Sequence, residues 1–224
     1  LKFQVVKGEM SYNYDLPGDG TPIIVPINMG DGPYTFRVMQ NTSGNNYVEL
    51  FSVIDNVNLS SETAPYLVPN VFVNYNESSA VVAKARELAQ GAANQGDVVR
   101  NIYQWVVDNI TYDHDKAAQL ASATGYVPDP DATLASGTGI CFDYASLGAA
   151  MLRSLGIPCQ VITGYVSPDD VYHAWNMVYI DGEWISVEIS IKPNSWTRVD
   201  LTFAASGAAS TIGDGTSYTD RYTY

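Results

Sequence analysis

The sequence predicts an α+β protein whose helices lie between two groups of β-strands. Residues 1–75 carry short apolar runs separated by turn formers, a pattern typical of antiparallel strands. Residues 78–112 and 141–154 carry apolar residues at helical spacing. From residue 160 onward, short β-branched and aromatic runs return, which predicts a second group of strands.

The composition indicates a large core and an acidic surface. Of the 224 residues, 46% are hydrophobic and 16% are charged, and no apolar run approaches the ~18 residues of a membrane-spanning helix. The formal net charge of −13 argues against nucleic acid or an anionic membrane as a partner. Two cysteines do not make a disulfide framework. Abundant Tyr, Asn, Ser, Thr and Gly with few Lys lead us to expect an exported protein, secreted or on the cell surface.

The first part of the chain predicts strands and carries no cluster of residues that points to chemistry. Turn formers at 18–20, 30–32 and 43–46 separate the apolar runs. The predicted strands are residues 3–6, 22–27, 33–39, 47–54 and 71–75.

Two amphipathic helices are predicted next. Ser78 and Ser79 are suited to cap a helix that runs to Gly91, and Asp97 is suited to cap a second helix. Both helices have a broad apolar face, which we expect to pack against the core. Residues 113–139, rich in Asp, Gly, Pro, Ala and Thr, are predicted as a long loop, and such loops are usually functional or mobile.

A third helix and a hairpin follow. The helix is predicted over residues 141–154, between Gly139 and the helix-ending run at 155–158. The dipeptide Asp181-Gly182 favours a two-residue hairpin turn. The predicted strands are residues 160–166, 173–180, 184–189 and 196–203, with a last one near 218–224.

The register of this hairpin brings a histidine and a carboxylate together. With Asp181 and Gly182 in the turn, counting outward pairs Trp175 with Glu188. His173 then lies on the same face as Glu188, one diagonal step away, at a Cα separation of ~7–8 Å. A long carboxylate side chain spans that distance, so the hairpin predicts a His–carboxylate pair.

Cys141 lies at the predicted start of the third helix. Unpaired backbone N–H groups and the positive end of the helix dipole favour a thiolate there, and the same N–H groups can stabilise an oxyanion. A Cys at a helix start, a His on a strand and a carboxylate on the next strand supply nucleophile, general base and orienting group. Cys141, His173 and Glu188 are therefore the candidate catalytic residues.

Other candidate residues have plainer interpretations. A single Cys is most often a small buried side chain, and we expect this of Cys159, which begins a core strand. His114, flanked by two aspartates, could form a metal site with Asp129 and Asp131, but acidic loop residues commonly form solvated turns. We expect no metal and no cofactor. Asp143 is expected to shape the start of the third helix rather than to transfer protons.

The motif segments, in chain order, are IYQW at 102–105, ITYD at 110–113, GTGICFDYA at 137–145, MLRSLGIP at 151–158, HAW at 173–175 and GEW at 182–184. This pattern resembles the transglutaminase-like superfamily, in particular bacterial cysteine protease domains, over roughly residues 78–203. The resemblance implies a papain-like core in which the nucleophile helix packs on an antiparallel sheet. It also implies Cys141, His173 and position 188 as the catalytic residues, although the usual Asp is replaced by Glu188.

The resemblance implies acyl transfer on peptide amide bonds through a thioester acyl-enzyme. We expect hydrolysis by a peptidase or amidase, because the chain is compact and lacks the several flanking domains of animal cross-linking enzymes. Two alternatives stay open: a protein cross-linking transglutaminase, and a non-catalytic surface binding module with a degenerate triad, which Glu188 favours. The acidic residues at 113–139 and the overall charge favour neutral or basic peptide or protein substrates.

Residues 1–77 resemble a β segment found ahead of such domains in exported bacterial proteins, notably from APY at 64–66 to VNY at 73–75. We therefore predict an N-terminal β-rich segment at 1–77 and a transglutaminase-like catalytic domain at 78–224. The protein is expected to be bacterial and extracytoplasmic, and its oligomeric state is left open.

Overall fold

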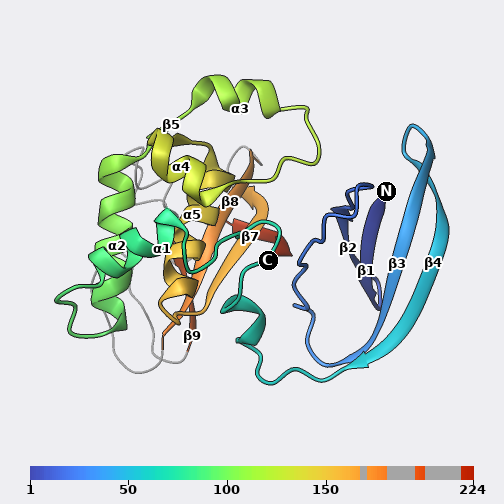
Figure 1. Ribbon diagram of the computed structural model, residues 1–224, viewed down its shortest axis with the longest axis horizontal. Coiled ribbons are helices and arrows are strands. Elements are labelled where there is room, and N and C mark those ends of the chain that lie inside the picture. Colours follow the sequence, from blue (N-terminus) through green and yellow to red (C-terminus); the bar gives the residue numbers. More distant parts are fainter. Residues whose placement is uncertain (167–170, 181–194, 200–217) are drawn as a thin grey trace. The chain divides into compact units, whose positions relative to one another are not determined.

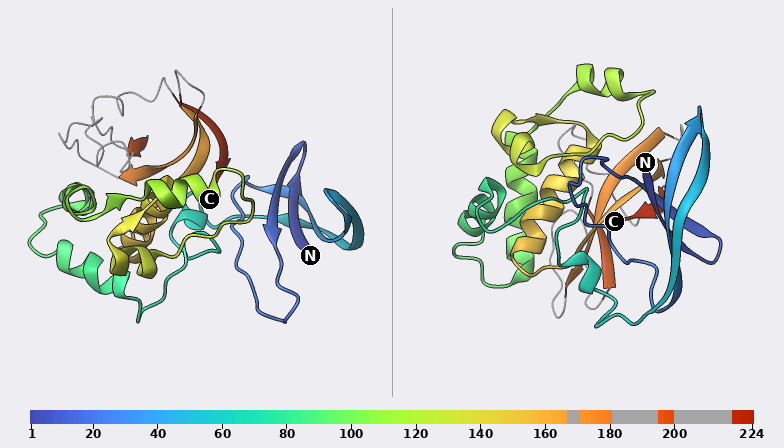
Figure 2. Two further views of the ribbon diagram at one scale, coloured as in Figure 1. Left: turned by 90° about the horizontal axis from the view of Figure 1, so that it is seen from above. Right: turned by 45° about the vertical axis from the view of Figure 1, so that its right-hand side comes forward.

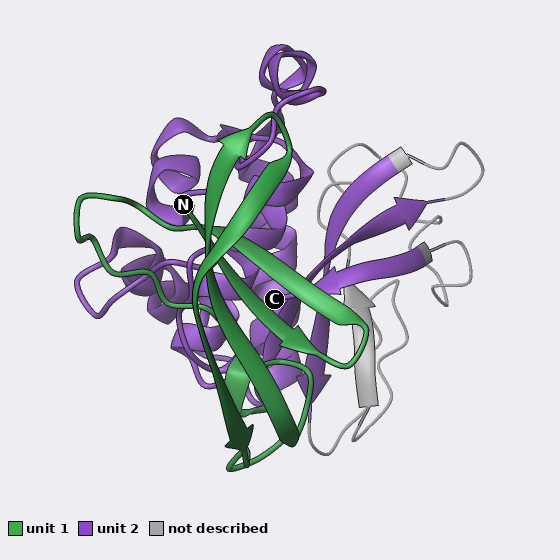
Figure 3. Cartoon of the chain, turned by 90° about the vertical axis from the view of Figure 1, so that its right-hand side faces the viewer, with its two compact units in different colours: residues 1–65 green, residues 66–224 purple. Residues whose placement is uncertain are grey.

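The computed structural model describes residues 1–166, 171–180, 195–199 and 218–224. The chain forms two compact units, Leu1–Pro65 and Tyr66–Tyr224 (Figure 3). This division falls ahead of the boundary predicted from the sequence at residues 77 and 78, and residues 66–77 belong to the second unit. The extent of the catalytic domain stays a prediction.

The first unit contains a four-stranded antiparallel sheet with the strand order β2-β1-β3-β4 (Figure 1). Gly8, at φ 59°, supplies the left-handed turn residue between β1 and β2. Val5, Tyr12, Tyr14 and Tyr34 are buried on one face of the sheet, where Val5 is the register partner of Tyr12. The strands are β1 (Lys2–Lys7), β2 (Met10–Asp15), β3 (Gly32–Ser43) and β4 (Asn46–Val57).

Three predicted strands lie within β1, β3 and β4, and two others are wrong. The predicted strand at 22–27 is not a strand, and its two prolines cannot donate ladder hydrogen bonds. Residues 71–75 contain one residue of an isolated bridge and no strand. β2 is not among the predicted strands, although Tyr12 and Tyr14 alternate with polar residues there and are buried.

The helices of the second unit agree with the sequence at three places. α1 begins after Ser79, and α2 and α5 lie where helices are predicted. The elements between residues 64 and 154 are η1 (Ala64–Tyr66), α1 (Ala80–Leu88), α2 (Gln95–Asn109), β5 (Thr111–Tyr112), α3 (His114–Leu120), α4 (Pro130–Ser136), β6 (Thr138–Gly139) and α5 (Cys141–Ser154).

Two expectations for this region are wrong. Asn94, not Asp97, caps α2, because the Asn94 side chain accepts a hydrogen bond from the backbone N–H of Asp97 at 2.9 Å. Residues 113–139 are not one long loop, since they contain α3, α4 and β6. Aspartate side chains cap both of these helices, and α4 also has Pro130 in its first turn and a left-handed Gly137 at its end.

The sheet of the second unit is antiparallel and has the order β10-β7-β8-β9. It consists of β7 (Cys159–Val166), β8 (Val171–Ile180), β9 (Ser195–Val199) and β10 (Tyr218–Thr223). The predicted two-residue hairpin is wrong in its described part. β8 pairs on one side with β7, and on the other side its residues 176–180 pair with β9, in a register that joins Ile180 to Ser195. The edge predicted for residues 184–189 is therefore taken by β9.

Helix α5 packs on one face of this sheet, and the other helices lie on the same side of the sheet (Figure 2). Ala174, Val178 and Ile180 of β8 belong to the same buried cluster as the interior of α5. Trp175, with Ile162 and Val166, forms a separate cluster on the opposite face. Both faces of the β7–β8 pair therefore carry buried apolar side chains.

Candidate active site

Cys141 is the first residue of α5, and its thiol is free and partly exposed. The preceding residue, Ile140, occupies the N-cap position and makes no side-chain cap hydrogen bond. An isoleucine side chain has no oxygen that accepts from the first-turn N–H groups, whereas Asn94, Asp113 and Asp129 do so in α2, α3 and α4. The start of α5 therefore has the chemistry of an anion-binding helix terminus beside a thiol.

His173 lies near the beginning of β8 and is 6% exposed. Its ring is 6.3 Å from that of Trp175, centroid to centroid, and the two planes differ by 24°. On β7 its register partner is Gly164, where a Cβ would approach Cη2 of Trp175 to 2.9 Å. The glycine thus leaves the room that the aromatic side chain next to the histidine occupies.

Two hydrogen bonds fix how α5 runs over the sheet. Near its end, Nε of Arg153 donates to the carbonyl oxygen of Cys159 at 2.8 Å, and Cys159 is the register partner of Val178. One turn after its start, the carbonyl oxygen of Ala145 accepts from Nδ2 of Asn176 at 2.9 Å. Moving toward the start of α5 therefore means moving toward the start of β8, so the first turn of α5 and His173 lie at the same end of this layer.

Successive side chains of β8 point to opposite faces of the sheet, and this determines on which face His173 lies. Ala174 and Asn176 point to the α5 side, so His173 points to the face that carries Trp175. The pairing with β9 covers only residues 176–180 of β8, so His173 lies beyond the part of the strand that β9 borders in the described chain. Glu188 lies outside the described residues. The hairpin register that brought it to His173 does not hold for residues 176–180, so its relation to His173 stays a prediction that rests on the family resemblance.

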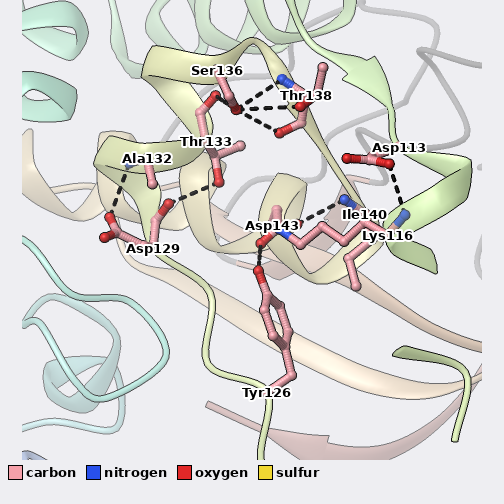
Figure 4. Close-up of polar contacts among 10 residues, drawn as sticks. All are labelled: Asp113, Lys116, Tyr126, Asp129, Ala132, Thr133, Ser136, Thr138, Ile140 and Asp143. Carbon is pink, nitrogen blue, oxygen red and sulfur yellow. Dashed lines mark hydrogen bonds and ion pairs between the residues drawn. The ribbon is translucent and has the colours of Figure 1, made fainter. Parts of the chain in front are cut away.

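Asp143, in the first turn of α5, is fully buried and accepts three hydrogen bonds (Figure 4). Its Oδ2 accepts from the backbone N–H of Ile140 at 2.9 Å and from Nζ of Lys116 at 2.6 Å. Its Oδ1 accepts from the hydroxyl of Tyr126. The expectation that Asp143 shapes the start of the helix is confirmed by the bond to Ile140.

Asp143 shifts the pKa values of the ionisable groups around it. Burial lowers the pKa of Lys116, but the hydrogen bonds and charge of Asp143 outweigh that effect, so the pKa is raised on balance. Burial and the bond to Asp143 raise the pKa of Tyr126 to about 12. Burial raises the pKa of Tyr112, and the negative charge of Asp143 adds to this rise.

Three of the four aspartates at residues 113–139 accept backbone hydrogen bonds at the starts of helices. Asp113 accepts from the N–H of Lys116, Asp129 accepts from that of Ala132, and Asp131 accepts from that of Val81 at the start of α1. Within the described ranges, no group of three or more His, Cys, Asp or Glu side chains has the geometry to hold a metal ion. Turn and cap formation accounts for these aspartates.

Cys159 is fully buried, as expected, and burial raises the pKa of its thiol to about 12. A neutral, enclosed thiol is unreactive. Of the two cysteines, Cys141 is the one whose surroundings suit chemistry.

A model of the transglutaminase-like superfamily matches residues 82–200. The chain belongs to this superfamily. The matched segment contains α5 and β8, and the mixed α+β fold with antiparallel sheets is the one that the sequence predicts.

Known proteins are similar to parts of the chain. Cytokinesis protein 3 of Schizosaccharomyces pombe is 33% identical over 120 residues, which are 47% of this chain and 12% of that protein. The kyphoscoliosis peptidase of Mus musculus is 31% identical over 112 residues, 46% of this chain and 16% of that protein. The chain thus spans a small part of the length of these relatives.

A solved structure from Cytophaga hutchinsonii, described as that of a candidate cysteine protease, resembles the whole chain. The TM-score is 0.53 and the identity 16%, and the alignment covers 100% of this chain and 76% of that one. At this identity the likeness concerns the fold. In the described part of the chain no helix is long and apolar enough to cross a membrane. The expected export, bacterial source, substrate class and lack of nucleic-acid partners stay predictions.

Lys116 and Tyr126 are not among the residues that the sequence points to. They lie 27 and 17 residues before Asp143, and neither belongs to a motif. The one available signal is the flanking Asp113, which favours a helix start and so places Lys116 on the first turn of a helix.

Proposed function

We propose that this protein is a cysteine-dependent acyltransferase acting on peptide amide bonds, with hydrolysis as its main reaction. The observation that carries the proposal is a partly exposed thiol on the first residue of α5, behind an N-cap side chain that cannot accept hydrogen bonds. Membership of the superfamily, and the kyphoscoliosis relative described as a peptidase, support the same chemistry.

In the proposed reaction, the His173 ring, which lies on the Trp175 face of β8, turns toward the start of α5 and takes the proton of Cys141. The thiolate then attacks the carbonyl carbon of the amide. N–H groups of the first turn of α5 stabilise the oxyanion. The C–N bond then breaks, and the amine leaves with the proton from His173. Water, deprotonated by the same imidazole, attacks the thioester and releases the carboxylic acid together with the Cys141 thiol.

Glu188 is proposed to accept a hydrogen bond from the other nitrogen of the His173 ring and so to fix its tautomer. Its side chain is one methylene longer than that of the usual aspartate. A shift of this size at an orienting group costs activity before it costs binding.

One experiment separates the open alternatives. The protein is incubated with a peptide library and a fluorescent primary amine, and both peptide cleavage and amine incorporation are scored. Cleavage that exceeds incorporation supports the hydrolase, and the reverse supports a cross-linking enzyme. The Cys141→Ala variant should lose both, while Cys159→Ala, which alters the buried thiol, should keep them.

The rate of alkylation by iodoacetamide tests the non-catalytic alternative. An activated Cys141 reacts well below pH 8, because the thiolate is the nucleophile. Alkylation that begins only above about pH 8, together with no turnover of any peptide, would contradict the proposal and favour a binding module.

A further inference from the structure

A buried carboxylate holds together three parts of the chain next to the proposed nucleophile. Asp143 is fully buried, yet its donors come from three places: the backbone of Ile140, the side chain of Lys116 in α3, and Tyr126 beyond α3. An ionised carboxylate tolerates such burial only with a cationic partner and hydrogen bonds to its remaining lone pairs. Lys116 supplies the charge, and Ile140 and Tyr126 supply the other two hydrogen bonds.

The segment from Asp113 to Tyr126 has few other attachments. None of the residues of α3 is buried, so this helix has no apolar anchor in the core. The backbone N–H of Asp113 donates to the carbonyl oxygen of Gly139 at 2.9 Å, which fixes the start of the segment. Beyond that point, the contacts with Asp143 and an edge-to-face contact between the rings of Tyr126 and Phe142, 6.5 Å between centroids, tie the segment to α5. Nζ of Lys116 also lies 4.9 Å from the centroid of the Tyr126 ring, so the two donors support each other.

Room for this contact is made by Gly139. A Cβ at that position would lie 2.7 Å from Cβ of Asp143 and 3.2 Å from its Oδ2. The close approach of β6 to α5 brings Ile140, the residue before Cys141, against Asp143, two residues after it. The carboxylate is therefore built into the turn that presents the thiol.

We infer that Asp143 is a positioning residue, which with Lys116 and Tyr126 fastens the 113–126 segment across the first turn of α5 as a wall of the site at Cys141. The role of this segment beside Cys141 rests on the proposed function, but its attachment to α5 through Asp143 does not. Asp143 neither contacts the reacting atoms nor transfers a proton in this role. Lys116 has a second effect, because it neutralises a negative charge two residues from Cys141.

The charge effect gives opposite predictions for the two partners. Without the Lys116 ammonium, the Asp143 carboxylate keeps the hydrogen bonds from Ile140 and Tyr126, and to the extent that it stays ionised it disfavours a thiolate at Cys141. Without the carboxylate, the ammonium favours it. The other ionisable groups around the pair are Tyr126 and Tyr112, with His114 at 4.9 Å from the Tyr112 ring and Asp113 on the backbone of Lys116.

The fastening is tested by amide hydrogen exchange, read by mass spectrometry, in Asp143→Asn and Lys116→Met. Exchange across residues 114–126 should become about tenfold faster in each variant, the factor expected for loss of one charge-assisted hydrogen bond. Lys84→Met is the matched control, because Nζ of Lys84 also pairs with a carboxylate, that of Glu87 at 2.7 Å, and lies 5.4 Å from the ring of Trp105. It should leave exchange in this segment unchanged.

The positioning role is also tested by the pH profile of Cys141 alkylation. The midpoint should rise by up to roughly half a pH unit in Lys116→Met, the full amount applying if Asp143 stays ionised, and should fall by roughly half a pH unit in Asp143→Asn. The double variant should return close to the wild-type midpoint, while keeping the fast exchange of the segment. Simple loosening of the structure would move both single variants in one direction.

Unchanged exchange across 114–126 in both single variants would overturn the inference, and so would equal acceleration throughout the chain. If Asp143→Asn does not fold, Lys116→Met and Tyr126→Phe decide alone, since Tyr126→Phe should speed exchange without moving the alkylation midpoint. Neither readout requires turnover. A wild-type Cys141 that reacts only at high pH would contradict the proposed function and leave the exchange result standing.

Discussion

Replacing Arg153 with methionine should destabilise the second unit by about 3 kcal/mol, the lower end of the range for three carbonyls, one buried and two partly buried, that each lose a donor at ~1–3 kcal/mol. Arg153 is 2% exposed, and its guanidinium donates to carbonyl oxygens of three separate segments. The acceptors are Cys159 at 2.8 Å, Val68 at 2.9 Å and Tyr224 at 2.8 Å. This one side chain joins α5, the start of β7, the chain ahead of α1 and the residue after β10.

The lower end applies for two reasons. The carbonyl oxygen of Tyr224 also accepts from the backbone N–H of Val161, so it keeps one donor in the variant. In addition, burial of the guanidinium is itself costly, as its pKa, lowered by burial to about 10, shows. Because that pKa still lies far above neutrality, Arg153 stays charged, and the loss should be the same at pH 5 and pH 8.

Urea unfolding followed by tryptophan fluorescence measures this loss, because all four tryptophans lie within Tyr66–Tyr224. Arg100→Met is the control: this arginine is half-exposed and paired with Asp97, so its loss should cost ~0.5 kcal/mol or less. Arg153→Lys keeps the charge but cannot reach three acceptors from one ammonium, and should be no more stable than Arg153→Met. A cost for Arg153→Met within ~1 kcal/mol of the control, or a fully stable lysine variant, would refute the reasoning.

Two further outcomes are expected. Gly164→Ala should lower the unfolding free energy by at least ~2 kcal/mol, because the new Cβ would lie 2.0 Å from the carbonyl oxygen of Thr219 and must push β10 away. The control Gly18→Ala has open space around it and should leave the unfolding free energy unchanged. Urea titrations that give both variants the same unfolding free energy would contradict this prediction. In the native protein, iodoacetamide should label Cys141 alone at any pH below about 10, since burial raises the pKa of the Cys159 thiol to about 12. In denaturant, labelling should rise to two cysteines per chain. Labelling of both cysteines in the native protein, read by mass spectrometry, would contradict this prediction and show that the core opens.

Local signals predict the elements that begin and end on their own residues. α5 was predictable to the residue because Gly139 precedes it and the Leu155-Gly156 turn follows, with apolar residues all along it. The same signals exist for α3 and α4, whose caps Asp113 and Asp129 stand at their starts. Composition rich in Asp, Gly and Pro favours a loop, but here those residues mark helix boundaries within the stretch.

Pairing between distant segments could not be predicted in the same way. Residues 176–180 pair with β9, a partner that the local hairpin signal of Asp181-Gly182 does not indicate. The partners of Asp143 are a second example. Its place in the motif shows a helix start, but Lys116 and Tyr126 reach it only because the tertiary fold brings the chain around α3 to the start of α5. Sequence patterns identify the candidate nucleophile, while the groups that surround it depend on tertiary structure.

The N-cap of α5 links stability to the proposed chemistry. An apolar residue in place of Ser, Thr, Asp or Asn at an N-cap costs a helix about 1 kcal/mol. Ile140 imposes this cost on α5, the most buried helix of the described chain, and two features offset it: burial of every residue from Asp143 to Arg153, and the carboxylate of Asp143 that accepts the N–H of Ile140 itself. That bond pairs the backbone N–H of Ile140. The N-cap side chain itself carries no oxygen that would compete for the N–H groups of the first turn. A serine at 140 would restore the cap bond, but its hydroxyl would then occupy the N–H groups that the proposed oxyanion needs. The stability of α5 therefore comes from Asp143 and the buried residues that follow it, and these groups do not occupy the N–H groups that the proposed oxyanion at Cys141 would use.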